Sequence, residues 1–338
     1  MIEPGAGRDS RMRQSPVTSH ESPAFRPGRS CPLSYRYAPE ALAHMAAIPA
    51  ETLYVIGGLY GNRPALDWIE QRARRERGPV AMVFNGDFNW FNVDEVGFRA
   101  VNDAVLRRTA LRGNVETELS GDGSNAGCGC AYPDFVGDDE VERSNRIMAR
   151  LRAAARPFSD LRARLGALPM TLAAEVGGLR VAIVHGDAES LAGWGFSREA
   201  LREPAQRETV ARWFAAARAR VFASSHTCLP VLEAVATPGG RCVLANNGAA
   251  GMPNFSNTRF GLMTRIARDA APDALYGTRL EGVAIEAVPV EYNCARFERE
   301  FLSNWPAGSP AHESYFGRIR SGPGYRVEDA ARDAAKAA

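Results

Sequence analysis

Short apolar runs, rich in β-branched residues, recur along the chain, and each ends in glycine and polar residues. Runs of this length that stop at turn residues predict buried strands. They occur at residues 51–58, 79–87, 178–187, 219–227 and 240–248. Segments with apolar residues at helical spacing lie between them, at 63–75, 93–108 and about 140–165. The alternation of strands with helices predicts an α/β core.

The segments between and after these runs add further elements. Residues 109–116 predict a short strand and a loop, and residues 259–267 and 280–292 predict strands that complete a sheet. Residues 117–140 are rich in glycine, serine, asparagine and aspartate, which predicts a long loop. Long loops inside compact domains are often functional. From residue 296 onward the sequence predicts helix and then turns.

Composition divides the 338 residues into three parts. Residues 1–48 predict a disordered or extended tail, because the first 30 are rich in Arg, Ser, Pro and Gly and lack the apolar stretch of a secretory signal. An over-extended gene start explains this region equally well. Residues 49–295 are expected to form the main domain. Residues 296–338 are expected to form a C-terminal extension that could cap it.

Charge and cysteine content narrow the class of partner. The net charge is +2, from 41 basic and 39 acidic residues, which gives no signal for nucleic acid. No apolar run is long enough to span a bilayer. Six cysteines in a chain of this size do not form a dense disulfide framework, so a reduced, cytoplasmic location is expected. The expected partner is a small molecule, and the sequence carries no signal for an oligomeric state.

Polar clusters at the strand ends carry the candidate chemistry. Asp87, Asn114, His185 and His226 each follow a predicted strand, and the carboxyl ends of strands in an α/β sheet form ligand sites. Taken singly, each residue is more typical of a turn or a structural hydrogen bond. Their order and shared context favour a site. A carboxylate, an amide oxygen and two imidazoles suit a divalent transition metal, namely Mn, Fe, Zn or Ni.

The ordered motifs resemble those of the calcineurin-like metallophosphoesterase superfamily. The matching stretches are GDFNW (86–90), GNVE (113–116), VHGD (184–187), SHTC (225–228) and NNGAAGMP (246–253). The resemblance runs from about residue 50 to 260. It implies a four-layer αββα sandwich of two mixed sheets flanked by helices. It also implies hydrolysis of a phosphate ester, by a phosphatase or a phosphodiesterase, with one or two metal ions.

The chain departs from the family pattern at several positions. The family's first motif, D-x-H, falls on Gly58 and Tyr60, and the second Asp of its G-D-x-x-D motif falls on Trp90. The histidine of G-N-H-[DE] falls on Val115, and the last histidine falls on Cys228. The resemblance therefore implies that one metal site is preserved. The second site would keep Asp87 and gain Cys228 as a substitute ligand.

The resemblance also assigns roles to single residues. Asp87, Asn114, His185, His226 and Cys228 are the expected metal ligands, and Asn114 and His185 also belong to the catalytic group. Tyr60 either hydrogen-bonds a phosphate oxygen and protonates a leaving group, or packs as an aromatic residue at the turn. Asn62 and Asn89 are expected to bind the substrate. Glu116 is expected to lie behind the ligands and to orient the imidazoles or the amide.

Two other functional classes remain open at this stage. The first is a weakly active or inactive protein of the same fold that binds phosphate, nucleotide or metal, because fold does not fix function. The second is a redox or thiolate-metal enzyme that uses Cys128, Cys130 and Cys228. The C-terminal residues His312, Arg318 and Arg320 either contact an anionic substrate or belong to an ordinary surface extension.

Overall fold

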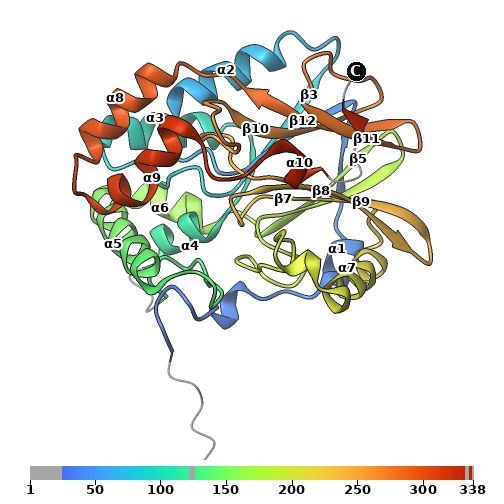
Figure 1. Cartoon of the computed structure of the whole chain (residues 1–338), viewed down its shortest axis with the longest axis horizontal. Coiled ribbons are helices and arrows are strands. Elements are labelled where there is room, and N and C mark those ends of the chain that lie inside the picture. The colour runs from blue at the N-terminus through green and yellow to red at the C-terminus, as the bar shows by residue number, and fades with distance from the viewer. Residues whose placement is uncertain (1–24, 122–125, 332–334, 337–338) are drawn as a thin grey trace, which may run out of the picture.

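Two facing β-sheets form the centre of the molecule, and helices cover their outer faces (Figure 1). The structure is a computed structural model, and it describes residues 25–121, 126–331 and 335–336. Both sheets contain parallel and antiparallel strand pairs. The predicted four-layer α/β sandwich of two mixed sheets is thereby confirmed.

The first sheet has seven strands. Their order is β13 (Ala335–Lys336), β11 (Tyr276–Leu280), β12 (Val283–Val290), β10 (Gly261–Ala267), β2 (Thr52–Ile56), β3 (Val80–Asn85) and β4 (Thr109–Leu111). Strands β2, β3 and β4 are parallel, with Thr52 opposite Val80, whereas β10, β11 and β12 are antiparallel. Every residue of β2 is buried, which explains its continuous apolar sequence.

The second sheet has six strands. Their order is β1 (Ala47–Ala50), β5 (Thr171–Val176), β6 (Leu179–Val184), β7 (Val221–Ser224), β9 (Gly240–Asn247) and β8 (Pro230–Thr237). Strands β6, β7 and β9 are parallel. Strands β1, β5 and β8 were not expected from the sequence, because their apolar residues are interrupted by glutamate or proline.

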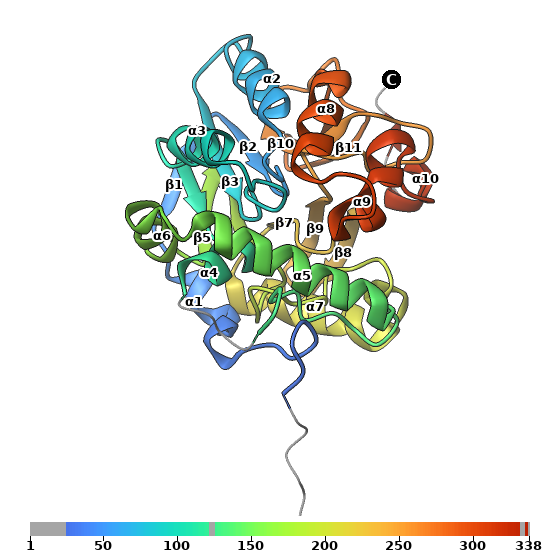
Figure 2. The same ribbon diagram turned by 90° about the vertical axis from the view of Figure 1, so that its left-hand side faces the viewer.

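Helices enclose the sheets on the outside and at one end. Figure 1 shows α2 (Arg63–Ala73), α3 (Glu95–Val105) and α8 (Cys294–Asn304) over the first sheet, and α1 (Pro39–Ala43) and α7 (Pro204–Ala217) under the second. The end is closed by α4 (Asn114–Ser120), α5 (Asp138–Ala155), α6 (Ser159–Gly166) and α9 (Pro310–Ser321). Figure 2 shows α5 running across this end beside α9, and Arg143 Nε donates to Ser314 Oγ at 2.8 Å. The short elements are η1 (Leu33–Tyr35), η2 (Ala200–Arg202) and α10 (Val327–Ala330).

Apolar packing between the sheets fixes their relative position. Side chains from both sheets meet in one buried cluster, which includes Val55, Val83, Val181 and Val243. Burial of such side chains is the main favourable contribution to folding. None of the helices in the described ranges has the length and apolar character that crossing a bilayer requires.

The N-terminal region is ordered further upstream than expected. Residues 1–24 lie outside the described residues, but residues 25–48 of the predicted tail form η1, α1 and the start of β1. Tyr35 and Leu42 are buried, and the Tyr35 hydroxyl donates to Glu118 Oε1 at 2.6 Å. The extended tail therefore does not reach residue 48, and the folded region begins before residue 49.

The predicted loop at residues 117–140 is shorter in the structure. Helix α4 begins at Asn114 and continues to Ser120, and α5 begins at Asp138. Residues 122–125 lie outside the described residues, and residues 126–137 form the loop before α5. The backbone N–H groups of Asp87 and Gly113 both donate to Glu116, which fixes the start of α4 against the turn after β3.

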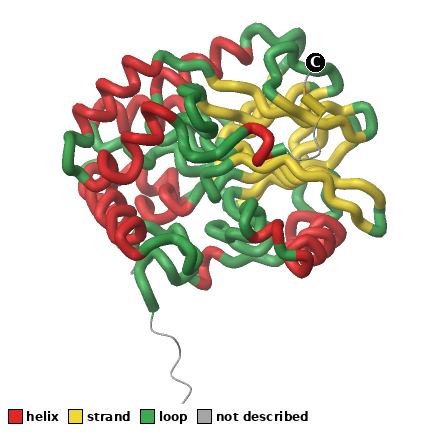
Figure 3. Tube along the Cα trace, viewed as in Figure 1, coloured by secondary structure: helices red, strands yellow, loops and turns green. Residues whose placement is uncertain are grey.

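The carboxyl ends of the parallel strands of both sheets meet at one edge of the sandwich. Asn85, at the end of β3, donates to the carbonyl of Val184 at the end of β6 at 2.9 Å. Asn247, at the end of β9, donates to the carbonyl of Gly57 after β2 at 3.0 Å. Figure 3 shows loops gathered between these strand ends and the helices. This edge therefore brings loops from both sheets together.

Candidate metal centre

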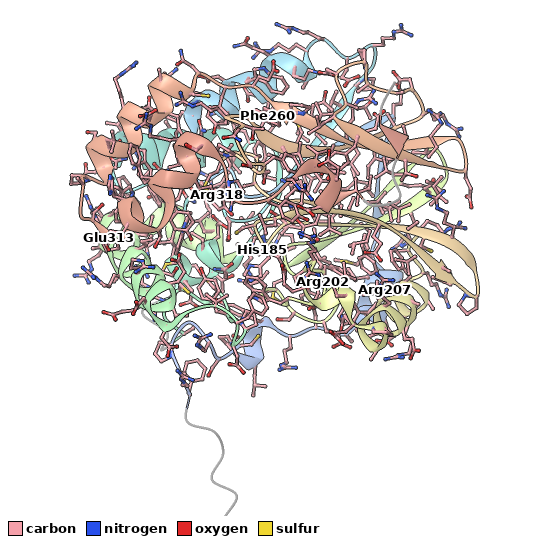
Figure 4. All side chains as sticks on the ribbon, viewed as in Figure 1. His185, Arg202, Arg207, Phe260, Glu313 and Arg318 are labelled. Carbon is pink, nitrogen blue, oxygen red and sulfur yellow. The ribbon has the colours of Figure 1, made fainter. Side chains whose placement is uncertain are left out.

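Four side chains converge where the two sheets meet. Asp87 follows β3, Asn114 is the first residue of α4, His185 follows β6 directly, and His226 lies two residues beyond β7. All four are buried. Figure 4 shows His185 near the middle of the molecule, between the two layers of strands. The structure thus brings together four residues that the sequence places at separate strand ends.

The atoms that face one another in this cluster are potential metal ligands. His185 Nε2 lies 3.3 Å from Asp87 Oδ2, 3.2 Å from Asn114 Oδ1 and 3.2 Å from His226 Nδ1. Asp87, His185 and His226 also form the group of His, Cys, Asp and Glu side chains in the described residues whose ligand atoms all lie within 4.8 Å of one another. The Asn114 amide oxygen adds a fourth ligand atom.

Backbone carbonyls orient the imidazoles and the amide. His185 Nδ1 donates to the carbonyl of Asn85 at 2.8 Å, and His226 Nε2 donates to that of Cys130 at 3.0 Å. Each ring therefore turns its other nitrogen toward the cluster. The Asn114 amide nitrogen donates to the carbonyl of Cys128 at 2.9 Å, which turns its oxygen inward. Ligand imidazoles are usually held in this way, through the ring nitrogen that faces away from the metal.

The charges in the cluster are strongly coupled. Burial opposes protonation of His185, but the adjacent Asp87 carboxylate outweighs burial and raises the His185 pKa. Burial and the proximity of His185 lower the pKa of His226 to about 4. Burial would raise the Asp87 pKa, but His185 lowers it overall. The space between these groups therefore holds positive charge, either a proton on His185 or a cation, and the donor set fits a borderline divalent metal.

A tight turn presents Asp87 to the cluster. Asp87 has a φ of 54°, and its N–H donates to Glu116 Oε2 at 2.7 Å. A Cβ at Gly113 would overlap Asp87 Oδ1, so this position requires glycine. Glu116 has its pKa raised to about 7 by burial and by the Asp87 charge. Glu116 supports the Asp87 turn through the backbone and does not belong to the compact group of candidate ligands.

Comparison with known proteins gives information about the fold alone. No protein-family model and no curated protein sequence matches the chain. The structure is similar to a hypothetical protein from Pyrococcus horikoshii OT3, with a TM-score of 0.53 and 14% identity over 81% of this chain and 99% of that one. It is also similar to a metallophosphoesterase from Sphaerobacter thermophilus, with a TM-score of 0.48 and 18% identity over 81% of this chain and all of that one (100%).

The likeness to the Pyrococcus horikoshii protein is one of overall fold. The α/β sandwich that the resemblance implied is the fold of this chain. At identities this low, similarity in structure carries no further information about substrate or activity.

Aromatic and sulfur atoms stand at the positions where the sequence resemblance implied ligands of a second metal. The hydroxyl of Tyr60 lies 3.0 Å from Cys228 Sγ, and both residues have φ near 60°, at 55° and 60°. A Cβ at Gly58 would lie 2.9 Å from the Tyr60 ring carbon Cζ. The Tyr60 ring therefore covers Gly58, where the family places an aspartate. Cys228 does not join the compact ligand group, contrary to its predicted role as a metal ligand.

Two predicted substrate ligands have structural roles instead. Asn62 caps α2 by accepting from the N–H of Ala65 at 2.9 Å, and its amide donates to the carbonyl of Gly251. Asn89 exchanges hydrogen bonds with Asn102 and accepts one from Asn92. Both Asn62 and Asn89 are fully buried, and neither lines the cavity at the metal centre. The sequence alone could not distinguish these structural roles from substrate binding, because the asparagine amide makes the same kinds of hydrogen bond in both.

A small cavity lies against the candidate metal centre, with a volume of about 30 Å³. It has room for about two water molecules. Its lining includes Tyr60, Asp87, Asn114, Val115, His226 and Cys228, together with Trp90, Cys130, Tyr132, Trp194 and Tyr315. Tyr315 lies far from the motifs in the sequence, and Trp194 lies in the loop after the VHGD motif (184–187); no local signal identified either residue.

The loop containing Cys128 and Cys130 supports the metal ligands through its backbone. Its carbonyls hold Asn114 and His226, as described above, and the Trp194 indole also donates to the Cys130 carbonyl at 2.9 Å. Both thiols are buried, and the Cys130 pKa is raised by burial and by Cys128. The loop predicted as functional thus reaches the site: its carbonyl oxygens accept from Asn114 and His226, and Cys130 Sγ also lies 3.6 Å from the Asn114 amide nitrogen.

The C-terminal helices reach the cavity through Tyr315 of α9. Arg318 donates to the carbonyls of Pro253 and Cys228, each at 2.8 Å, behind the cavity wall. Arg320 is exposed, and His312 stacks on Phe316. The hydrogen bonds of Arg318 connect α9 to the two loops that carry Pro253 and Cys228.

Proposed function

We propose that this protein is a metal-dependent phosphoric ester hydrolase that uses one divalent metal ion. The observation that supports this proposal most directly is the convergence of Asp87 Oδ2, Asn114 Oδ1, His185 Nε2 and His226 Nδ1 in a buried cluster. Their orientation by backbone carbonyls supports a ligand set that is ready to bind before the metal arrives.

Each ligand would act through an atom that already faces the cluster. Asp87 supplies the negative charge, and His185, His226 and Asn114 supply neutral donors. When bound, a divalent ion polarises a phosphoryl oxygen and lowers the pKa of a bound water molecule. The Tyr60 hydroxyl stays protonated near neutral pH, because burial and Cys228 raise its pKa well above its usual value. It is the residue that we assign to hydrogen-bonding the ester on the cavity side.

Crowding around Gly58 favours one metal over two. A second ion of the family type would need the aspartate that Gly58 replaces and the space that the Tyr60 ring fills. The residues present therefore fit one metal and do not fit the second. Without a second ion, no hydroxide can be held between two metals, and the Val115 side chain cannot donate the hydrogen bond that a histidine would donate. We therefore expect slow turnover, since one such donor is worth roughly a hundredfold in rate.

The decisive experiment combines metal content with turnover. The untagged protein is loaded with Mn, Fe, Zn or Ni, the metal per chain is measured, and hydrolysis of p-nitrophenyl phosphate and bis-p-nitrophenyl phosphate is followed. We expect about one ion per chain, and loss of both metal and turnover in Asp87→Asn and His226→Ala. Absence of turnover with every metal would overturn the hydrolase proposal.

Val115 supports a second candidate function, a phosphate- or metal-binding protein without catalysis. An apolar side chain lines the cavity where the family has a histidine. Metal uptake and binding of inorganic phosphate without ester hydrolysis would favour this alternative. Restoration of turnover in Val115→His would show that one missing side chain separates the two functions.

A further inference from the structure

The cavity beside the metal centre is poor in charge. Asp87 is the one ionised carboxylate among its lining residues, and none of the described residues that line it is a lysine or an arginine. A divalent cation beside this single carboxylate leaves an excess of roughly one positive charge, because Asn114 and the two imidazoles are neutral as ligands. The site can therefore balance about one negative charge on its substrate.

The positive charge of Arg318 acts on Tyr60 and Cys228, which line the cavity, but backbone carbonyls hold its guanidinium away from a direct ion pair with a ligand. Arg318 donates through Nε to the carbonyl of Pro253 and through Nη2 to that of Cys228, both at 2.8 Å. Nη2 also lies 3.4 Å from Asn254 Oδ1. Releasing the guanidinium would leave buried carbonyls without donors, which costs free energy.

Aromatic rings form much of the remaining wall. Trp90 and Tyr315 meet edge to face, with centroids 6.4 Å apart, and Tyr132 and Trp194 lie 5.8 Å apart. The Trp194 ring also contacts the His226 ring at 5.5 Å. Such rings offer large apolar faces to a planar ligand. They therefore favour an ester group that is itself apolar or aromatic.

We propose that the substrate is a phosphodiester that carries one negative charge and an apolar or aromatic ester group. This inference rests on the proposed function. A diester has one negative charge, whereas a monoester approaches two above its second pKa of about 6. The second charge of a monoester would be buried without a partner among apolar walls, which is unfavourable. Val115 also leaves the leaving group without a histidine donor, which favours leaving groups that need little protonation.

Binding requires the aromatic wall to open. The cavity holds about two water molecules, so a ring can enter when Tyr315 and the Tyr132–Trp194 pair separate. Tyr315 belongs to α9, and Tyr132 belongs to the loop before α5, so the two parts of the wall come from separate elements. Ligand entry should therefore change the fluorescence of Trp90 and Trp194.

Three inert probes separate charge from ring contacts. Diphenylphosphinate carries one charge and two rings, phenylphosphonate carries up to two charges and one ring, and dimethylphosphinate carries one charge and no ring. Binding of each to the zinc-loaded full chain is measured by calorimetry and tryptophan fluorescence at pH 8. We expect diphenylphosphinate to bind at least about tenfold more tightly than the others.

The outcomes distinguish this inference from the proposed function. Equal or tighter binding of phenylphosphonate would overturn the charge assignment, and equal binding of dimethylphosphinate would overturn the aromatic one. Failure of all three probes to bind the zinc-loaded chain would overturn the whole inference. Failure to take up zinc would refute the metal site itself. Because the probes are not hydrolysed, their binding is independent of turnover.

Matched variants of α9 test the role of the wall. Tyr315→Leu keeps an apolar side chain but removes the ring, and we expect diphenylphosphinate affinity to fall about two- to tenfold with dimethylphosphinate affinity unchanged. Phe316→Leu is the control, because Phe316 stacks on Phe301 and does not line the cavity. Equal effects of the two substitutions would refute direct contact between Tyr315 and the ligand.

Discussion

His226 Nδ1 lies 3.2 Å from His185 Nε2, and the other nitrogen of each ring donates to a backbone carbonyl. Two lone pairs at this distance repel unless a proton or a cation lies between them. Asp87 Oδ2, 3.3 Å from the same His185 nitrogen, adds negative charge to this space. The folded chain therefore prepares a position that a proton and a metal ion would compete to occupy.

This competition predicts that metal affinity falls as the pH is lowered. Because Asp87 raises the His185 pKa despite burial, His185 holds a proton up to a higher pH than an ordinary histidine does. A metal ion must displace that proton, so affinity should weaken below the raised His185 pKa by up to about tenfold per pH unit. Zinc titrations by calorimetry in two buffers of different ionisation enthalpy would report the released proton. Proton release that is absent throughout this range would contradict the prediction.

Restoring the family's first motif should create a second metal site. We expect Gly58→Asp alone to destabilise the protein, because its Cβ would lie 2.9 Å from the Tyr60 ring and its φ is +63°. Adding Tyr60→His removes the ring and supplies a ligand. The double variant should bind about two ions per chain and hydrolyse esters faster, measured by elemental analysis and p-nitrophenol release. A double variant that folds but still binds one ion would show that Cys228 also blocks the site.

Asn145 should affect metal affinity without contacting the metal. Its Oδ1 accepts from the N–H of Cys128 at 2.8 Å, and the carbonyls of Cys128 and Cys130 orient two of the ligands. Asn145→Leu should weaken zinc binding about tenfold, the usual effect of losing an outer support. Asn145→Asp keeps the acceptor oxygen and is the control. Identical zinc affinities, with native circular dichroism, would contradict a role for this loop.

A buried ion-pair network should control stability independently of the site. Arg265 on β10 is fully buried, and it donates to Glu76 at 2.9 Å and to Glu286 at 3.1 Å. Arg265→Leu would remove the arginine partner of the buried Glu286 and leave Glu76 with Arg72 as its ion-pair partner, which we expect to cost about 3–5 kcal/mol in thermal or urea unfolding. Arg268→Leu, at an exposed position, should cost about 0.5 kcal/mol or less. Similar losses in the two variants would refute the network's importance.

The sequence predicted the strand ends well, because apolar runs and turn residues carry local signals. Asp87, Asn114, His185 and His226 meet because parallel strands end at the same edge, which follows from the fold class. Strands β1, β5 and β8 were missed, since glutamate or proline interrupts their apolar residues. Asn62 and Asn89 were misassigned for a related reason: their amides satisfy buried backbone or side-chain groups.

The aromatic wall could not be predicted from any motif. Trp194 and Tyr315 are brought to the cavity by the loop after β6 and by α9, at positions that only tertiary packing determines. Similarly, the role of Cys128 and Cys130 lies in their carbonyls, which every residue possesses. A sequence identifies unusual side chains, but it does not show which backbone oxygens support a ligand.

The division of the four ligand residues between the two sheets has a consequence for folding. Asp87 and Asn114 follow strands of the first sheet, and His185 and His226 follow strands of the second. An ion held by all four would tie together the two sheets, which dock face to face in the folded chain. Metal uptake during refolding would then report the docking step, and amide hydrogen exchange should slow in both sheets together once the ion is bound.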